Sequence, residues 1–202
     1  RAIIEPGGEV VVKKTILVNN KYKVTLETVH QPKIDQQLVI YQPKDLKIDM
    51  FYSARIITVE PWDGYPFSFV LLDSLLSSSE PCAVLEEDCL TVILFDNILR
   101  VDLSTRAILQ CIECENIGGL EQIHTIDDGY IIKGECDIFR YDNVLNCVWR
   151  FSARDIFATN GQNEAFWIAN NEVHCRDWQG WHYVLDMQGK LISEVAEKAF
   201  VN

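Results

Sequence analysis

The sequence predicts an all-β protein in which antiparallel β repeats follow one another, and three observations predict this class. Residues 97–102 (NILRVD) align with residues 137–142 (DIFRYD) when the chain is displaced against itself by forty positions. Turn-forming residues separate short apolar runs along most of the chain, and helix signals are confined to residues 153–157 and 194–200. A repeat of about forty residues is typical of β modules that bury their apolar faces against their neighbours.

The N-terminal part, residues 1–79, is expected to be an antiparallel β region of irregular order. It opens with a hairpin whose strands, residues 10–18 and 22–27, are joined by a turn at Asn19 and Asn20. Apolar and polar residues alternate in the second strand, which predicts that one face of the hairpin is exposed to solvent. Further strands are expected at residues 38–41, 53–59 and 67–71.

The C-terminal part, residues 80–202, is expected to hold three repeats that begin near Glu80, after a serine-rich stretch. Each repeat contains four apolar runs joined by short turns, and the third is looser because one loop is longer. The expected strands are 83–85, 90–95, 98–103 and 107–112, then 122–126, 130–133, 138–141 and 147–151, then 165–168, 172–176, 182–185 and 191–195. Both a domain boundary at residue 80 and one continuous domain agree with this pattern.

Each repeat contains a similar strand–turn–strand segment: VDLSTRAIL, YDNVLNCVW and LDMQGKLI. These segments resemble the blades of quinoprotein-type and WD-type β-propellers, in which a strand ends in Asp, a polar turn follows, and the next strand often carries Trp. Asp102, Asp142 and Asp186 match that Asp, Gly189 matches the turn glycine, and Trp149 matches the aromatic residue. The Gly-His and Trp-Asp pairs of such blades are missing, and the first two repeats lack the turn glycine. The resemblance implies propeller-blade-like repeats that serve as a binding scaffold, closed by the N-terminal strands or stacked openly.

The formal charge of −12 makes phosphate backbones and anionic membrane surfaces poor partners, because both would be repelled at long range. A basic protein would be attracted, although acidity also simply keeps a β-rich chain in solution. The seven cysteines, mostly within apolar runs, suggest reduced thiols. No apolar export signal is visible near Arg1, so a cytoplasmic location is expected.

Neither a metal site nor a catalytic template is expected from the sequence. Cys111 and Cys114 form a lone CxxC, and His174 beside Cys175 is a poor second pair, since neighbours on a strand point to opposite faces. The histidines lie in no known catalytic motif, so we expect no cofactor and no enzyme activity.

Acidic turns are the main candidate for partner binding. Glu87 with Asp88 and Asp127 with Asp128 occupy equivalent positions in the first two repeats. Stacking of the repeats is therefore expected to bring the two pairs to one rim of the protein, where the repulsion between like charges favours binding of a cationic partner. The ordinary alternative is that such residues make good solvated turns. The candidate acidic residues are Glu86, Glu87, Asp88, Asp127, Asp128, Glu135 and Asp137.

The loop DWQGW adds two aromatic residues, Trp178 and Trp181, of which we expect one to be exposed as an interface anchor and one to be buried. The leading hypothesis is an acidic protein-binding module, in its sharpest form an immunity protein or inhibitor that neutralises a basic, nuclease-type toxin. Two alternatives are a structural subunit of an assembly and an enzyme for a small metabolite whose site residues are dispersed along the chain.

Overall fold

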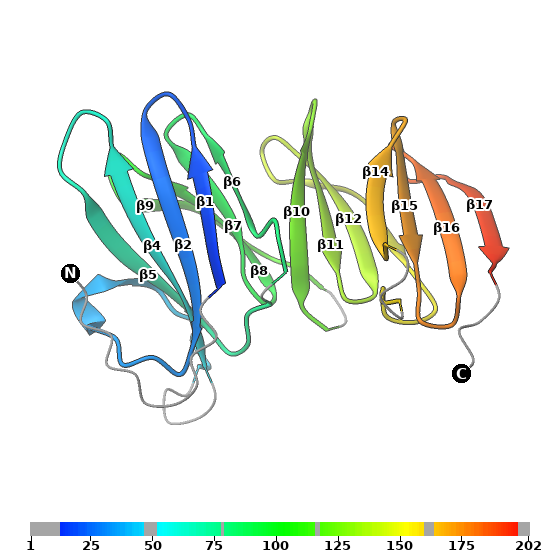
Figure 1. Cartoon of the computed structure of the whole chain (residues 1–202), viewed down its shortest axis with the longest axis horizontal. Coiled ribbons are helices and arrows are strands. Elements are labelled where there is room, and N and C mark those ends of the chain that lie inside the picture. The colour runs from blue at the N-terminus through cyan, green and yellow to red at the C-terminus, as the bar shows by residue number, and fades with distance from the viewer. Residues whose placement is uncertain (1–12, 47–51, 78, 116–117, 160–163, 198–202) are drawn as a thin grey trace. The chain divides into compact units, whose positions relative to one another are not determined.

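The computed structural model describes residues 13–46, 52–77, 79–115, 118–159 and 164–197, and these residues are almost entirely β (Figure 1). Within these described ranges, one short 3₁₀ turn, Gln36–Leu38, accompanies seventeen strands in four sheets. The predicted all-β class is confirmed. Within the described residues, no helix has the length and apolarity that a membrane crossing requires.

The first sheet contains the N-terminal strands in the order β1-β2-β4-β5-β3, with only β3 parallel to its neighbour. The strands are β1 (Lys13–Val18), β2 (Tyr22–His30), β3 (Val39–Tyr41), β4 (Ser53–Pro61) and β5 (Phe67–Asp73). The hairpin turn lies one residue later than predicted, at Asn20 and Lys21, because Val18 pairs with Lys23 and the Asn19 backbone N–H donates to Tyr22 O at 3.0 Å. Asn19 Oδ1 accepts hydrogen bonds of 2.8 Å from the backbone N–H groups of Lys21 and Tyr22, which closes this turn. The expected residues 10–12 of β1 lie outside the described residues.

The other three sheets each contain four consecutive antiparallel strands. Their bounds are β6 (Ala83–Glu86), β7 (Cys89–Ile93), β8 (Asn97–Asp102), β9 (Ala107–Glu113), β10 (Leu120–Ile126), β11 (Gly129–Gly134), β12 (Asp137–Asp142), β13 (Cys147–Ser152), β14 (Phe166–Ala169), β15 (Glu172–Arg176), β16 (Trp181–Asp186) and β17 (Leu191–Ala196). Every strand expected in the repeats is present, with its ends displaced by at most two residues.

The three four-stranded sheets also share an irregularity in the hydrogen-bond register. In each four-stranded sheet the pairing of the third and fourth strands shifts by one residue at the equivalent position. The extra residues on the fourth strands are Leu109, Val148 and Ile192, with exposed fractions of 50%, 51% and 53%. A bulge leaves one residue outside the ladder, and here it leaves an apolar side chain in solvent.

The three matched aspartates close the turns between the third and fourth strands. Asp102 accepts from the backbone N–H groups of Ser104 and Thr105, both at 2.8 Å, and Asp142 and Asp186 accept equivalent pairs of bonds. Each carboxylate therefore replaces backbone partners that the turn lacks.

The two expected helical stretches are not helical in their described residues. Residues 153–157 form bends, and residues 194–196 belong to β17, where Val195 pairs with His182. Residues 198–200 of the second stretch lie outside the described residues.

The chain divides into two compact units, each with its own core. The first spans Arg1–Cys114 and Glu121–Ile123, and the second spans Glu115–Leu120 and His124–Asn202. The expected boundary at residue 80 falls within the first unit, between its five-stranded sheet and the β6–β9 sheet. In the second unit, the facing sides of the β10–β13 and β14–β17 sheets share a core that includes Ile131, Val173 and Tyr183. All seven cysteines are free thiols.

Candidate functional site

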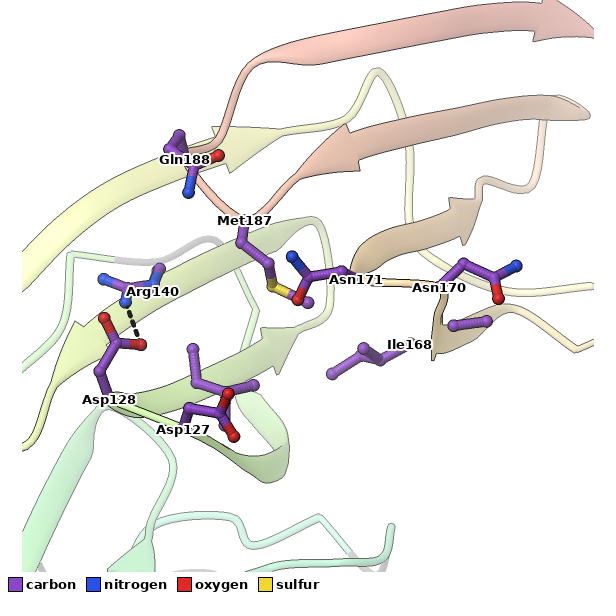
Figure 2. Close-up of a pocket in the computed structure, with 10 residues that line it drawn as sticks. Asp127, Asp128, Arg140, Ile168, Asn170, Asn171, Met187 and Gln188 are labelled. Carbon is purple, nitrogen blue, oxygen red and sulfur yellow. Dashed lines mark ion pairs between the residues drawn. The ribbon is translucent and has the colours of Figure 1, made fainter.

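A cavity of about 590 Å³ lies within the second unit, where turns of its two four-stranded sheets meet (Figure 2). Three turns contribute to it: Asp127 and Asp128 between β10 and β11, Asn170 and Asn171 between β14 and β15, and Met187 with Gln188 between β16 and β17. Arg140 on β12 and the apolar side chains of Ile126, Ile168 and Ala169 complete the lining. Six of its ten lining residues are polar or charged and four are apolar, so this concave site is more polar than a typical small-molecule pocket.

The two asparagines are suited to their tight turn. Ala169 pairs with Glu172, which leaves Asn170 and Asn171 as a two-residue loop with φ values of 52° and 63°. Both angles lie in the left-handed region, which Asn tolerates better than most residues, and such a loop matches the twist of a hairpin. The turn presents two amide groups, each able to donate and accept hydrogen bonds, at the cavity.

An ion pair forms one wall of the cavity. Arg140 Nη2 lies 2.5 Å from Asp128 Oδ1, and Figure 2 shows this contact as a dashed line. The Arg140 side chain is 10% exposed, whereas that of Asp128 is 74% exposed, so the pair joins a buried cation to a solvated anion. Arg140 Nε is buried and has no hydrogen-bond partner among the described residues. The pair therefore neutralises Asp128 and leaves the arginine incompletely satisfied.

Unlike Asp128, which is paired with Arg140, Asp127 carries a charge that is available to a ligand. Its side chain is exposed, and no ion pair or hydrogen bond reaches it from the described part of the chain. Around it, the amides of the neighbouring turn can accept hydrogen bonds, while Ile168 and Met187 offer apolar surface that Met can adapt to different shapes. This combination suits a ligand with an apolar stem and a cationic head.

In the acidic turn of the first unit, Asp88 has partners within that unit. Asp88 accepts a hydrogen bond of 2.8 Å from the Tyr22 hydroxyl and lies 2.5 Å from Lys21 Nζ. These two partners, Lys21 first, lower the pKa of Asp88, while burial and the Asp88 hydrogen bond raise the pKa of Tyr22 to about 12. Glu86 lies 3.9 Å from Arg100, and Glu87 is exposed. Because Asp88 and Asp127 belong to different units, their convergence at one rim stays a prediction.

Two of the acidic residues lie at the other end of the second unit's strands. Glu135 precedes β12 and Asp137 begins it, at the end opposite the β10–β11 turn. Asp137 is fully buried, and it accepts hydrogen bonds from Arg150 Nε at 3.0 Å and Ser152 Oγ at 2.5 Å. The Asp137 carboxylate therefore anchors β13 to β12, and its expected contact with a partner stays a prediction.

Of the two tryptophans, one is exposed as expected, whereas the other is partly buried where a buried residue was expected. Trp178 is 57% exposed, whereas Trp181 packs against the core of the second unit with the Arg154 guanidinium 3.8 Å from its ring centroid. The buried Asp177 holds the loop by accepting from Trp181 N–H and the Tyr183 hydroxyl. This loop joins β15 to β16, at the end of the sheet opposite the cavity.

The two CxxC residues have different environments. Cys111 is exposed on β9 and Cys114 is buried, and the described residues contain no group of three or more His, Cys, Asp or Glu side chains placed to bind a metal ion. Cys175 is buried and its neighbour His174 is half-buried, as expected for opposite faces of a strand.

Arg140, both asparagines, Met187 and Gln188 line the cavity but are not among the site residues predicted from the sequence. One signal could have found those that lie in turns. Turns that follow the first and third strands of an antiparallel meander lie at the same end, so equivalent turns of successive repeats meet there.

No protein-family model matches the chain, and neither does any curated protein sequence. Several solved structures are similar in fold. BamB from Moraxella catarrhalis is 14% identical with a TM-score of 0.49 over 92% of this chain and 59% of BamB. The CNH domain of AfRom2 is 11% identical with a TM-score of 0.47 over 93% of this chain and 55% of that domain. The computationally designed Ika8 protein is 13% identical with a TM-score of 0.45 over 90% of this chain and 60% of Ika8.

The three four-stranded sheets are propeller-like blades. Consecutive antiparallel strands in each sheet, the equivalent bulges and the equivalent turn aspartates establish this from the chain itself. The chain spans less than two thirds of each similar structure named above, and these likenesses describe fold alone.

Proposed function

We propose that this protein is a protein-binding module that holds a basic segment of a partner at the cavity of its second unit. The observation that carries the proposal is the uncompensated carboxylate of Asp127 on the cavity wall, beside amide groups and apolar surface. A lysine or arginine side chain matches all three features, since its stem is apolar and its head is a cationic donor. The formal charge of −12 further supports attraction of a basic protein.

In its sharpest form, the proposed module is an immunity protein or inhibitor that neutralises a basic, nuclease-type toxin in the cytoplasm. A nuclease must be basic along its phosphate path, and an acidic protein can use the same field to bind there and to associate rapidly. The charge of the chain and the cavity support a nuclease-type toxin as the partner and support other basic proteins equally.

A pull-down from the native source at low and high salt tests the proposal. We expect a basic protein to co-purify at low salt and to be lost at high salt, because screening weakens charge attraction. The variant Asp127→Lys should lose the partner at both salt concentrations. Asp63→Lys, which makes the same charge change at an exposed residue of the first unit, should retain it. Equal retention by both variants would refute the role of the cavity.

An assembly subunit is a second candidate, favoured by the edge strand β17. Its residues Leu191, Ile192 and Val195 are 40%, 53% and 52% exposed, and an apolar edge strand can pair with another chain. This candidate predicts a stable complex that survives high salt, which the same pull-down would reveal.

An enzyme for a small metabolite is the third candidate, because the cavity has the size of a small-molecule site. A cationic metabolite would satisfy Asp127 as a lysine side chain does. Turnover of such a compound by the purified protein, abolished by Asp127→Asn, would favour this candidate over the binding module.

A further inference from the structure

Two histidines face each other on the β14–β17 sheet, on the side away from the core. His174 on β15 and His182 on β16 bring Nδ1 and Nε2, respectively, to a separation of 3.4 Å. Their neighbours Cys175 and Tyr183 pair directly and are buried, so alternation along both strands places the histidines on the other face. This pair is separate from the cavity and from the proposed partner.

In each ring, the nitrogen that does not face the other histidine lies close to a carboxylate, and we call it the outer nitrogen. His182 Nδ1 lies 3.2 Å from Glu197 Oε1, and His174 Nε2 lies 3.4 Å from Glu172 Oε2. The facing nitrogens share a hydrogen bond in the tautomer that places a hydrogen on one of them. When both outer nitrogens instead donate to their carboxylates, which only accept, the two facing nitrogens both present lone pairs. Two lone pairs 3.4 Å apart repel each other unless an electron-pair acceptor lies between them.

We propose that His174 and His182 bind a divalent transition-metal ion of the zinc class. Zinc–imidazole bonds of about 2.0–2.1 Å in tetrahedral geometry place two ligand nitrogens about 3.4 Å apart, and this separation is already present in the protein. Histidine ligands commonly donate their second N–H to a carboxylate, which orients the ring and increases its basicity. Glu172 and Glu197 are placed for that role.

The surrounding side chains hold this geometry. The Trp167 ring stacks on His174 with a centroid distance of 4.8 Å and an interplanar angle of 8°. Arg176 lies 4.5 Å from the Trp167 centroid and donates to Glu197 Oε2 at 2.9 Å, which positions that carboxylate. The His174 and His182 side chains are 15% and 19% exposed, so both rings are restrained and still reachable.

The local charge also favours a cation. Two carboxylates, Glu172 and Glu197, face one guanidinium, Arg176, which leaves an excess of negative charge beside the neutral imidazoles. The described residues offer no third His, Cys, Asp or Glu ligand. Water or a group from another molecule would complete the coordination, as at zinc sites that keep an open position.

Calorimetric titration of the full chain with Zn²⁺ alone, in metal-free buffer near neutral pH, tests the proposal. We expect one saturable site, whose affinity falls by about tenfold or more in His174→Gln and in His182→Gln. The matched control is His30→Gln, which removes a histidine from the first unit and should leave the affinity unchanged. Glu197→Gln should weaken binding by about 10–100-fold while both metal ligands remain.

Titration with Co²⁺ distinguishes this site from the thiols without any substitution. Two imidazole ligands predict visible d–d absorption without the strong near-ultraviolet band of a cobalt–thiolate bond. A thiolate band, equal affinity in all four variants, or no saturable binding would overturn the proposal. The last result would show that a shared proton alone joins the two rings.

Discussion

At the residue scale, four carboxylates in similar acidic sequences have four different environments. Asp88 is held by Lys21 and Tyr22, Asp128 by Arg140, and Asp137 by Arg150 and Ser152, whereas Asp127 has no partner among the described residues. Sequence alone gives each of them the same charge and turn propensity. Their partners come from strands that only the folded sheets bring close, so no local pattern could separate the available carboxylate from the three compensated ones.

The buried Asp137 predicts a measurable stability cost. In Asp137→Asn the charge that compensates Arg150 is removed, so the free energy of unfolding should fall by about 2–3 kcal/mol. Urea unfolding of the full chain measures this change. The exposed Asp63→Asn should lie within about 0.5 kcal/mol of the parent protein. A loss equally small in Asp137→Asn would mean that Arg150 finds water as an adequate partner.

At the scale of the elements, the sequence predicts strands well and helices poorly. The forty-residue repeat locates each of the twelve repeat strands, because alternation and turn residues recur at fixed spacing. Residues 194–196 carry helix-forming Glu and Ala, yet pairing of Val195 with His182 overrides that preference. The common bulge is also invisible in the sequence, since it depends on how two strands twist together.

The turn aspartates predict an acid-dependent loss of stability. Hydrogen bonds lower the pKa of Asp102 and of Asp142 below the ordinary value of 3.8, chiefly from Ser104 for Asp102 and from Asn146 for Asp142. At a pH between the pKa of the native state and that of the unfolded state, the unfolded chain binds more protons than the native protein. The stability that the ionised Asp102 and Asp142 contribute is therefore complete above pH 3.8 and is lost as the pH falls through their native pKa values.

Thermal unfolding from neutral pH down to about pH 3 measures this effect. Asp102→Asn removes one titrating group but keeps an acceptor oxygen, so the melting temperature of this variant should depend less on pH in the acid range. Asp73, whose pKa is raised mainly by burial, acts in the opposite direction in both proteins. Identical acid profiles for the two proteins would contradict the assignment.

A substitution of Gly189, in the turn between β16 and β17, is also expected to lower the stability of the protein. Its φ is +81°, and an added Cβ would lie 2.6 Å from the Trp149 ring, whose Nε1 donates to Met187 O at 2.9 Å. Gly189→Ala should therefore lower the free energy of unfolding by about 1–3 kcal/mol, through backbone strain and a clash with the ring. Repeating the substitution in Trp149→Ala separates these causes, because only the clash disappears there. An equal cost in both backgrounds would assign the whole effect to the backbone.

At the scale of the whole molecule, net charge and local charge have different consequences. The formal charge of −12 acts on an approaching basic protein at long range, and it is shared by paired and unpaired carboxylates alike. Contact after docking depends instead on carboxylates without internal partners. The sequence therefore predicts the sign of the charge of a proposed partner, whereas the structure places Asp127, a carboxylate without a partner among the described residues, on the cavity wall.

This distinction predicts how two matched variants alter binding kinetics with a basic partner. Asp127→Lys and Asp63→Lys change the net charge equally, so both should slow association slightly, and the association rate of each should fall as salt is added. Only Asp127→Lys removes a contact made in the complex, so only this variant should dissociate faster, by about tenfold or more. Surface plasmon resonance at two salt concentrations measures both rates. If dissociation were unchanged in Asp127→Lys, the partner would respond to net charge alone, and the cavity would have no part in holding it.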